Sequence, residues 1–317
     1  MNINFNAKKA FCVLDVTPVI KQRFESFISN FVIQVLSGMD YSNLKSITVT
    51  DNFIEDVLAF QHKYLNGVIG VTNNKHGRAF GKMIYVPTEE TYHIFLDSEY
   101  ASFLIDDSFM SNLHFSEHDE KLLNYVVIQR NCAMNLFAHE LEHYKFANIQ
   151  KSPVMDNSFV SQCIKLMFEI FDEYNASRKS TEKFSTSAFS YIEEYVLKIE
   201  QDIMIQRLKY NKREISLDTF VSLFHQLTRQ VLMYVAVIIS SNLVCNKNEV
   251  IFENCRCHIL IKELELEFDS LYSLLQSGEQ IVISQQLVEW LIKYYELFNV
   301  YISETDEGLY YDIPYSL

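Results

Sequence analysis

Glycine and proline are scarce in this sequence, with seven glycines and four prolines in 317 residues. These residues dominate tight turns and helix ends, so their scarcity argues against a many-turned β architecture and favours helices. Four of the glycines, Gly67, Gly70, Gly77 and Gly81, fall within one short segment. We interpret this segment as a mobile loop at the edge of a cleft, because it lacks the spacing of a phosphate-binding loop.

Basic residues are also in deficit, with 27 Lys and Arg against 41 Asp and Glu and a formal net charge of −14. This balance opposes binding to nucleic acid or to an anionic membrane surface. The longest apolar run, residues 231–245, is interrupted by Ser240, Ser241 and Asn242 and is too short to span a bilayer. We therefore expect no nucleic-acid partner, no membrane partner, and a buried helix at this run.

Paired cysteines and a secretory leader are missing as well. The six cysteines are scattered, and residues 1–15 lack the basic start and apolar run of a signal peptide. Both features predict a reducing compartment, the cytoplasm. Cys255 and Cys257 stand one residue apart, closer than the usual spacing of zinc ligands, and we interpret them as ordinary thiols.

The periodicity of apolar residues predicts an α+β fold. Residues 46–50 alternate like a strand, and residues 82–86 and 91–96 predict a hairpin joined by a short polar turn. Helical spacing occurs in residues 17–36, 52–62, 119–145, 158–178, 187–210, 217–243, 263–276 and 284–300. We expect a mixed domain over residues 1–180, a helical subdomain over residues 181–317 that frames a cleft, and a loosely held acidic tail from residue 303.

A five-residue motif, His139-Glu-Leu-Glu-His143, lies near the end of the predicted helix over residues 119–145. Residues four apart on a helix project from nearly the same face, so both imidazoles can reach one metal ion. Glu140 then stands beside the metal as a general base for a water molecule. The motif predicts a zinc site, because burying two histidines and a glutamate without partners in a largely apolar helix would be costly.

A zinc site of this kind needs a third protein ligand. The metzincin pattern would place a histidine at position 149, but that residue is Ile149. A glutamate on the following helix is the remaining common solution, and Glu173 is the best candidate. Asp172 and Glu169 compete with it, since a small change in helix phase would exchange them.

These residues resemble the gluzincin-like zincin metallopeptidases, in which the HExxH motif is completed by a glutamate in an E-x-x-A segment, here Glu173 to Ala176. The hairpin over residues 82–96 is similar to the strand pair that precedes the zincin active helix, and the resemblance covers about residues 45–180. It implies that His139, His143 and Glu173 bind Zn²⁺ and that Glu140 is the general base of peptide hydrolysis, most readily in an endopeptidase.

The resemblance also implies a donor for the developing oxyanion. Candidates are His225, Tyr174, Arg178 and Tyr144, although a core role for His225 and a carboxylate partner for Arg178, such as Asp172 or Glu142, are the simpler interpretations. A protein or peptide substrate would add as a strand to the sheet edge, and the acidic tail would occupy the cleft as a self-inhibitor. The alternative is a regulatory or interaction module that keeps the zincin fold and a structural zinc without catalysis.

Overall fold

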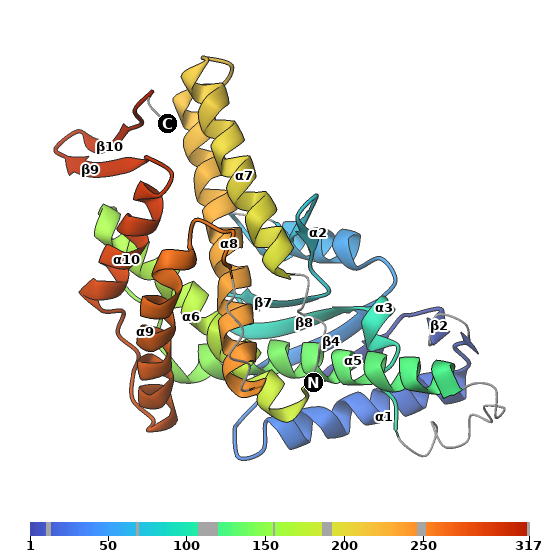
Figure 1. The fold of residues 1–317 in the computed structure, drawn as a ribbon. Helices are drawn as coiled ribbons and strands as arrows, with labels where there is room; N and C mark the ends of the chain where they lie inside the picture. Colours follow the sequence, from blue (N-terminus) through green and yellow to red (C-terminus); the bar gives the residue numbers. More distant parts are fainter. Residues whose placement is uncertain are drawn as a thin grey trace. The chain divides into compact units, whose positions relative to one another are not determined.

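The computed structural model describes residues 1–10, 14–67, 70–106, 120–154, 156–185, 192–245 and 252–315 (Figure 1). The protein is α+β, as its periodicity predicts. It contains two compact units, the first formed by Met1–Lys145 and Lys179–Ala188 and the second by Phe146–Arg178 and Phe189–Leu317. Two of the boundaries between the units fall inside continuous helices, α5 (Glu120–Ile149) and α6 (Phe159–Lys183).

The first unit is built on a four-stranded sheet with the order β1-β4-β8-β7. Strands β1 (Asn2–Phe5), β4 (Leu44–Thr50) and β8 (Thr91–Asp97) run parallel, and β7 (Gly81–Val86) is antiparallel to β8. The predicted hairpin is thus β7 and β8, with β7 at the edge of the sheet. The parallel strand β1 is not predicted by the sequence, because four residues without clear alternation carry little signal.

Alternate residues of β8 face opposite layers of helices. Tyr92 packs edge to face against Tyr144 of α5, with ring centroids 5.2 Å apart. On the other face, His93 and Phe95 contact Phe60 of α2 (Phe53–Tyr64). Gly81 pairs with Leu96, and Leu96 lies on the same face of β8 as Tyr92. Gly81 therefore faces the layer that contains α5.

Helix α1 (Pro18–Val35) shares the α5 side of the sheet. Its N-cap is Thr17, whose hydroxyl accepts a hydrogen bond from the Ile20 N–H at 3.3 Å. Phe24 stacks on Phe5 of β1, and Phe31 stacks on Phe137 of α5 with centroids 5.2 Å apart. Helix α1 therefore joins the edge strand β1 to the helix that carries the HExxH motif.

The second unit is mainly helical and buries a large apolar and aromatic core. Besides parts of α5 and α6, it contains α7 (Ile192–Asn211), α8 (Leu217–Cys245), α9 (His258–Gln276), α10 (Gln285–Glu296), β9 (Tyr301–Thr305) and β10 (Gly308–Asp312). Figure 1 shows α7 and α8 side by side as a helical hairpin. Trp290 of α10 donates a hydrogen bond to the Leu260 carbonyl of α9 at 2.8 Å, which ties these two helices together.

Helix α8 begins well before the apolar run at residues 231–245 and, unlike that run alone, is long and apolar enough to cross a membrane by length and composition. More than half of its most apolar stretch is buried inside the second unit, including Val231, Val235 and Ile239. The core helix of a soluble protein passes the same test of length and composition, so this property alone is weak evidence for a membrane span.

The description of the C-terminal residues as a loosely held tail is wrong. Tyr301–Thr305 and Gly308–Asp312 form an antiparallel hairpin, and Gly308, the first residue of β10, has a φ of 123°. Arg207 of α7 donates to the Pro314 carbonyl at 2.6 Å, and Tyr311 lies 3.0 Å from the imidazole of His225. These partners are about 90 to 110 residues away in sequence, so local composition does not reveal them.

Candidate metal centre

The two motif histidines project together from α5. Their Nε2 atoms lie 3.0 Å apart, and their rings are perpendicular, with centroids separated by 4.5 Å. Two nitrogens bound to one tetrahedral zinc at 2.0–2.1 Å are about 3.3 Å apart, so the observed separation is close to the one that a shared metal requires. The helical spacing of four thus brings His139 and His143 together as predicted.

Glu173 of α6 belongs to the same group of donors. One ligand atom each from His139, His143 and Glu173 lie within 4.8 Å of one another. Two imidazoles and one carboxylate are a donor set that suits zinc and leaves a fourth position for a water or a substrate oxygen. The group contains neither of the competitors, and Glu169 is engaged by Arg229 at 3.2 Å.

Residues of the first unit also hold the end of α6 beside α5. Asn135 of α5 donates to the Phe184 carbonyl at 2.8 Å, and the Lys183 ammonium lies 2.6 Å from the Glu142 carboxylate. The same carboxylate receives Lys145 at 3.0 Å. Glu142 is buried. The pKa of Lys145 is lowered by burial, and the adjacent Glu142 carboxylate offsets part of this effect. The two lysines therefore neutralise the charge of the Glu142 carboxylate, which gives this residue a structural role in the motif.

The candidate general base, Glu140, is buried and lies over the edge strand of the sheet. A Cβ atom added at Gly81 of β7 would meet Glu140 Oε1 at 2.4 Å and its Cδ and Cγ at 2.9 Å. Only glycine therefore allows this carboxylate its observed position. Sequence reasoning missed Gly81, although a glycine at the start of a β-rich run is a recognised sign of close approach.

Gly81→Ala is expected to displace Glu140 while leaving the fold intact, because the end of a flexible side chain can move aside. A displacement of about 1 Å at a catalytic group can cost about 10²-fold in rate. We expect kcat/KM for peptide hydrolysis to fall about 10²-fold, with unchanged zinc content and melting temperature. Gly67→Ala is the matched control, since nothing lies within 4 Å of a Cβ there. Equal activity of the two variants would contradict the assigned position of Glu140.

The four oxyanion candidates all have other contacts. Tyr144 is buried and its hydroxyl donates to Asn43, while Tyr174 is buried against Phe171 and its hydroxyl accepts a hydrogen bond from Arg178 at 2.8 Å. Burial raises the pKa of Tyr174 to about 12. His225 is partly buried, and burial lowers its pKa. Its Tyr311 partner gives it the surroundings of a core residue, and the oxyanion donor stays unassigned.

Arg178 has a carboxylate partner, as expected, and that partner is Asp269. Its guanidinium lies 2.5 Å from the carboxylate of Asp269 on α9 and 3.9 Å from the centre of the Tyr272 ring. Glu142 has Lys145 and Lys183 as ion-pair partners. Asp269 is 91 residues from Arg178, and only the tertiary fold brings the two together.

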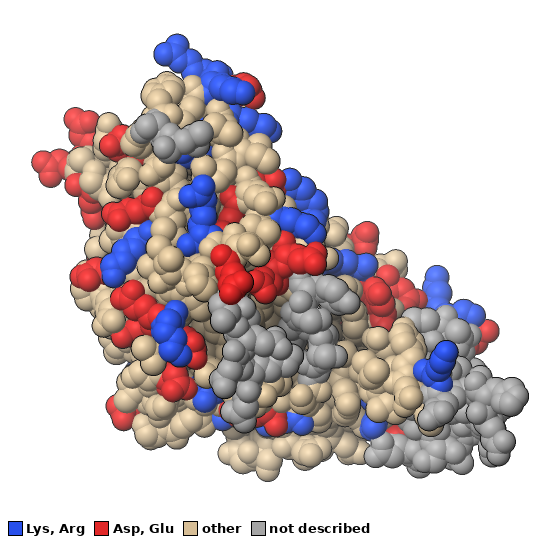
Figure 2. All heavy atoms as spheres, viewed as in Figure 1, with Lys and Arg blue, Asp and Glu red and all other residues tan. Residues whose placement is uncertain are grey.

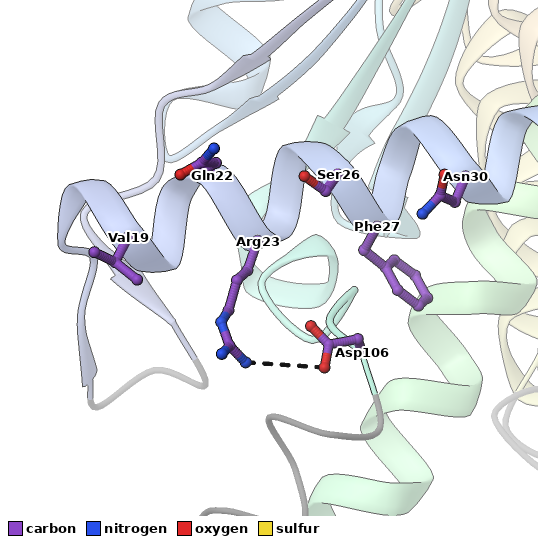
Figure 3. Close-up of a pocket in the computed structure, with 7 residues that line it drawn as sticks. All are labelled: Val19, Gln22, Arg23, Ser26, Phe27, Asn30 and Asp106. Atoms are coloured by element: carbon purple, nitrogen blue, oxygen red, sulfur yellow. Dashed lines mark ion pairs between the residues drawn. The ribbon is translucent and has the colours of Figure 1, made fainter.

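A surface pocket of about 290 Å³ lies elsewhere in the first unit, along α1 (Figure 3). Its lining includes Arg23 and Asp106, which form an ion pair at 3.9 Å, and it contains none of the motif residues. A single wide ion pair between half-exposed side chains offers no reactive chemistry. The candidate metal centre is therefore defined by its donor atoms and not by this cavity.

Comparison of the chain with protein-family models, curated proteins and solved structures found no match.

Proposed function

We propose that this protein is a zinc-dependent peptidase of the zincin type that hydrolyses protein or peptide substrates. The observation that carries the proposal is the convergence of one donor atom each from His139, His143 and Glu173 within 4.8 Å, with Glu140 on the same helix turn. A purely structural zinc site usually has four protein ligands, whereas three ligands and an adjacent carboxylate are typical of hydrolytic zinc.

Each residue has a separate role in this proposal. His139, His143 and Glu173 would hold the zinc, which when bound supplies Lewis acidity toward a scissile carbonyl. Glu140 accepts the proton of the attacking water and delivers it to the leaving amine. Gly81 keeps that carboxylate in place, and Glu142 with its two lysines positions the turn of α5 between the ligands.

The sheet edge supports a peptide substrate. Among the described strands, β7 pairs with β8 alone, so its outer edge can accept an added strand through main-chain hydrogen bonds. Glu140 lies against Gly81 at the first residue of this strand. A peptide extended along β7 would therefore pass close to the proposed base, which favours cleavage within a chain.

The charge pattern supports the same class of substrate. On the face shown in Figure 2, Lys and Arg are interspersed with Asp and Glu and do not form a continuous basic surface. With a formal net charge of −14, such a surface suits proteins better than the phosphate backbone of a nucleic acid. We extend the proposal to a cytoplasmic peptidase.

The experiment that tests the function measures zinc and cleavage on the same preparation. Elemental analysis should find zinc, mass spectrometry should find cleaved peptides in a library, and a chelator should abolish cleavage until zinc is restored. Glu173→Gln should lower zinc affinity and activity, whereas Glu169→Gln, which loses only an ion pair with Arg229, should preserve both. Zinc-dependent melting without cleavage of any peptide would instead support the regulatory module with a structural zinc.

A further inference from the structure

A second group of metal-binding side chains lies in the second unit, at the start of α9. One carboxylate oxygen of Glu200 and the sulfurs of Cys255 and Cys257 lie within 4.8 Å of one another, and all three residues are buried. Glu200 comes from α7, and the two cysteines come from the turn that leads into α9. The tertiary fold thus adds a carboxylate to a cysteine pair whose spacing alone predicts nothing.

The hydroxyl of Tyr294 gives an independent indication of a ligand. This side chain on α10 is fully buried, and its oxygen has no hydrogen-bond partner among the described residues. Burial, followed by the charges of Glu200, Cys257 and Cys255, raises the pKa of Tyr294 well above its ordinary value. The charges of the same three acids act on this phenol, and a buried polar group without a hydrogen-bond partner is costly.

We propose that Glu200, Cys255 and Cys257 form a second metal site that holds a structural zinc ion, with Tyr294 as its oxygen ligand or hydrogen-bond partner. Two thiolates and a carboxylate are donors that zinc accepts at 2.0–2.3 Å. Binding would release the two thiol protons to solvent, and the metal charge would offset the buried anions. The site is closed and lacks a free base, which suits a structural metal and not a catalytic one.

Helix capping explains only part of this arrangement. The Glu200 carboxylate accepts hydrogen bonds from the Arg256 N–H at 2.6 Å and the Cys257 N–H at 3.0 Å. It therefore caps the N-terminus of α9. A carboxylate has about four lone-pair sites, which leaves capacity for a metal. The Cys257 thiol also hydrogen-bonds with Cys255 and Glu200, but neither capping nor these thiol contacts give the buried Tyr294 hydroxyl a partner.

A disulfide between the cysteines accounts for the group less well. It would join the two sulfurs but leave Glu200 and Tyr294 facing an apolar bond. Both thiols are buried, and burial keeps cysteines unreactive toward oxidants. A metal uses all four side chains and fixes α7, the turn before α9, and α10 to one another.

The test uses the full chain carrying His139→Ala and His143→Ala, so that the first centre cannot contribute. Zinc analysis of this variant, purified under reducing conditions, should find about one zinc per chain. Cobalt substitution should produce the sulfur-to-metal charge-transfer absorption that only thiolate ligands give. The band should disappear in a further Cys255→Ser/Cys257→Ser variant and persist in Cys163→Ser, which alters a buried cysteine outside the group.

Absence of zinc from the His139→Ala/His143→Ala variant, a cobalt spectrum without the thiolate band, or a mass two hydrogens lower from a disulfide would each overturn the proposal. If the double serine variant does not fold, Glu200→Gln and Tyr294→Phe replace it, and each should lower zinc affinity at least tenfold. Because the first centre is removed in these proteins, failure of the peptidase proposal would not alter the outcome.

Discussion

Glu140→Gln is expected to lower kcat/KM for peptide hydrolysis by about 10³-fold or more while zinc remains bound. Glutamine has nearly the same shape as glutamate and fits over Gly81, but it cannot accept the proton of the attacking water. General acid and base catalysis contributes about 10²–10⁴-fold, and the loss of this base removes both proton transfers. Steady-state kinetics and zinc analysis on the same preparation measure the effect.

The adjacent acid of the motif provides the matched control. Glu142→Gln removes a buried carboxylate that faces Lys145 and Lys183, so we expect a lower melting temperature but a smaller loss of kcat. The loss of stability should be smaller than for a fully buried ion pair, because both lysines are partly exposed and water compensates their charges in part. Full activity of Glu140→Gln, or a rate loss confined to Glu142→Gln, would refute the assigned roles.

His143→Ala is expected to abolish zinc binding at the first centre together with all peptidase activity. A ligand that binds only the folded state at about 100 times its Kd stabilises that state by about 2.7 kcal/mol. The variant should lose this zinc-dependent share of its stability, visible as a smaller rise in melting temperature when zinc is titrated. His139→Ala should behave in the same way, because the two imidazoles project from one face of α5 and their Nε2 atoms lie side by side.

His62→Ala controls for the loss of a histidine as such. His62 is an exposed residue of α2, outside the group of metal donors, and its removal should change neither zinc content nor activity. If the His143→Ala chain bound as many zinc ions as the wild-type chain, His143 would not be a zinc ligand and the proposed function would fail with it.

Much of the fold follows from local patterns. Helix α1 (Pro18–Val35) matches the expected residues 17–36, and α8 (Leu217–Cys245) matches 217–243, because long amphipathic or apolar stretches with few glycines and prolines have few alternatives. The β7 and β8 hairpin was equally clear from its polar turn. The strand predicted at residues 46–50 corresponds to β4 (Leu44–Thr50), but its parallel partner β1 was not predicted.

Within the two candidate metal sites, the sequence predicts donors that share one helix better than contacts between different elements. The spacing of His139 and His143 determines their convergence, because the helix repeat alone places them on one face. By contrast, Glu140 is held by a contact with Gly81, and Cys255 and Cys257 acquire Glu200 only through packing between α7 and α9. Those contacts join residues about 55 to 60 positions apart.

The sequence by itself determined the α+β class, most helices, and two of the donors of the candidate zinc centre, since each depends on spacings within a single helix or hairpin. Only the tertiary structure shows which residue lies against Glu140 and which partners engage Arg178 and the C-terminal hairpin. The physical reason is that these contacts are set by side-chain packing between elements that are distant in sequence, which no local periodicity encodes.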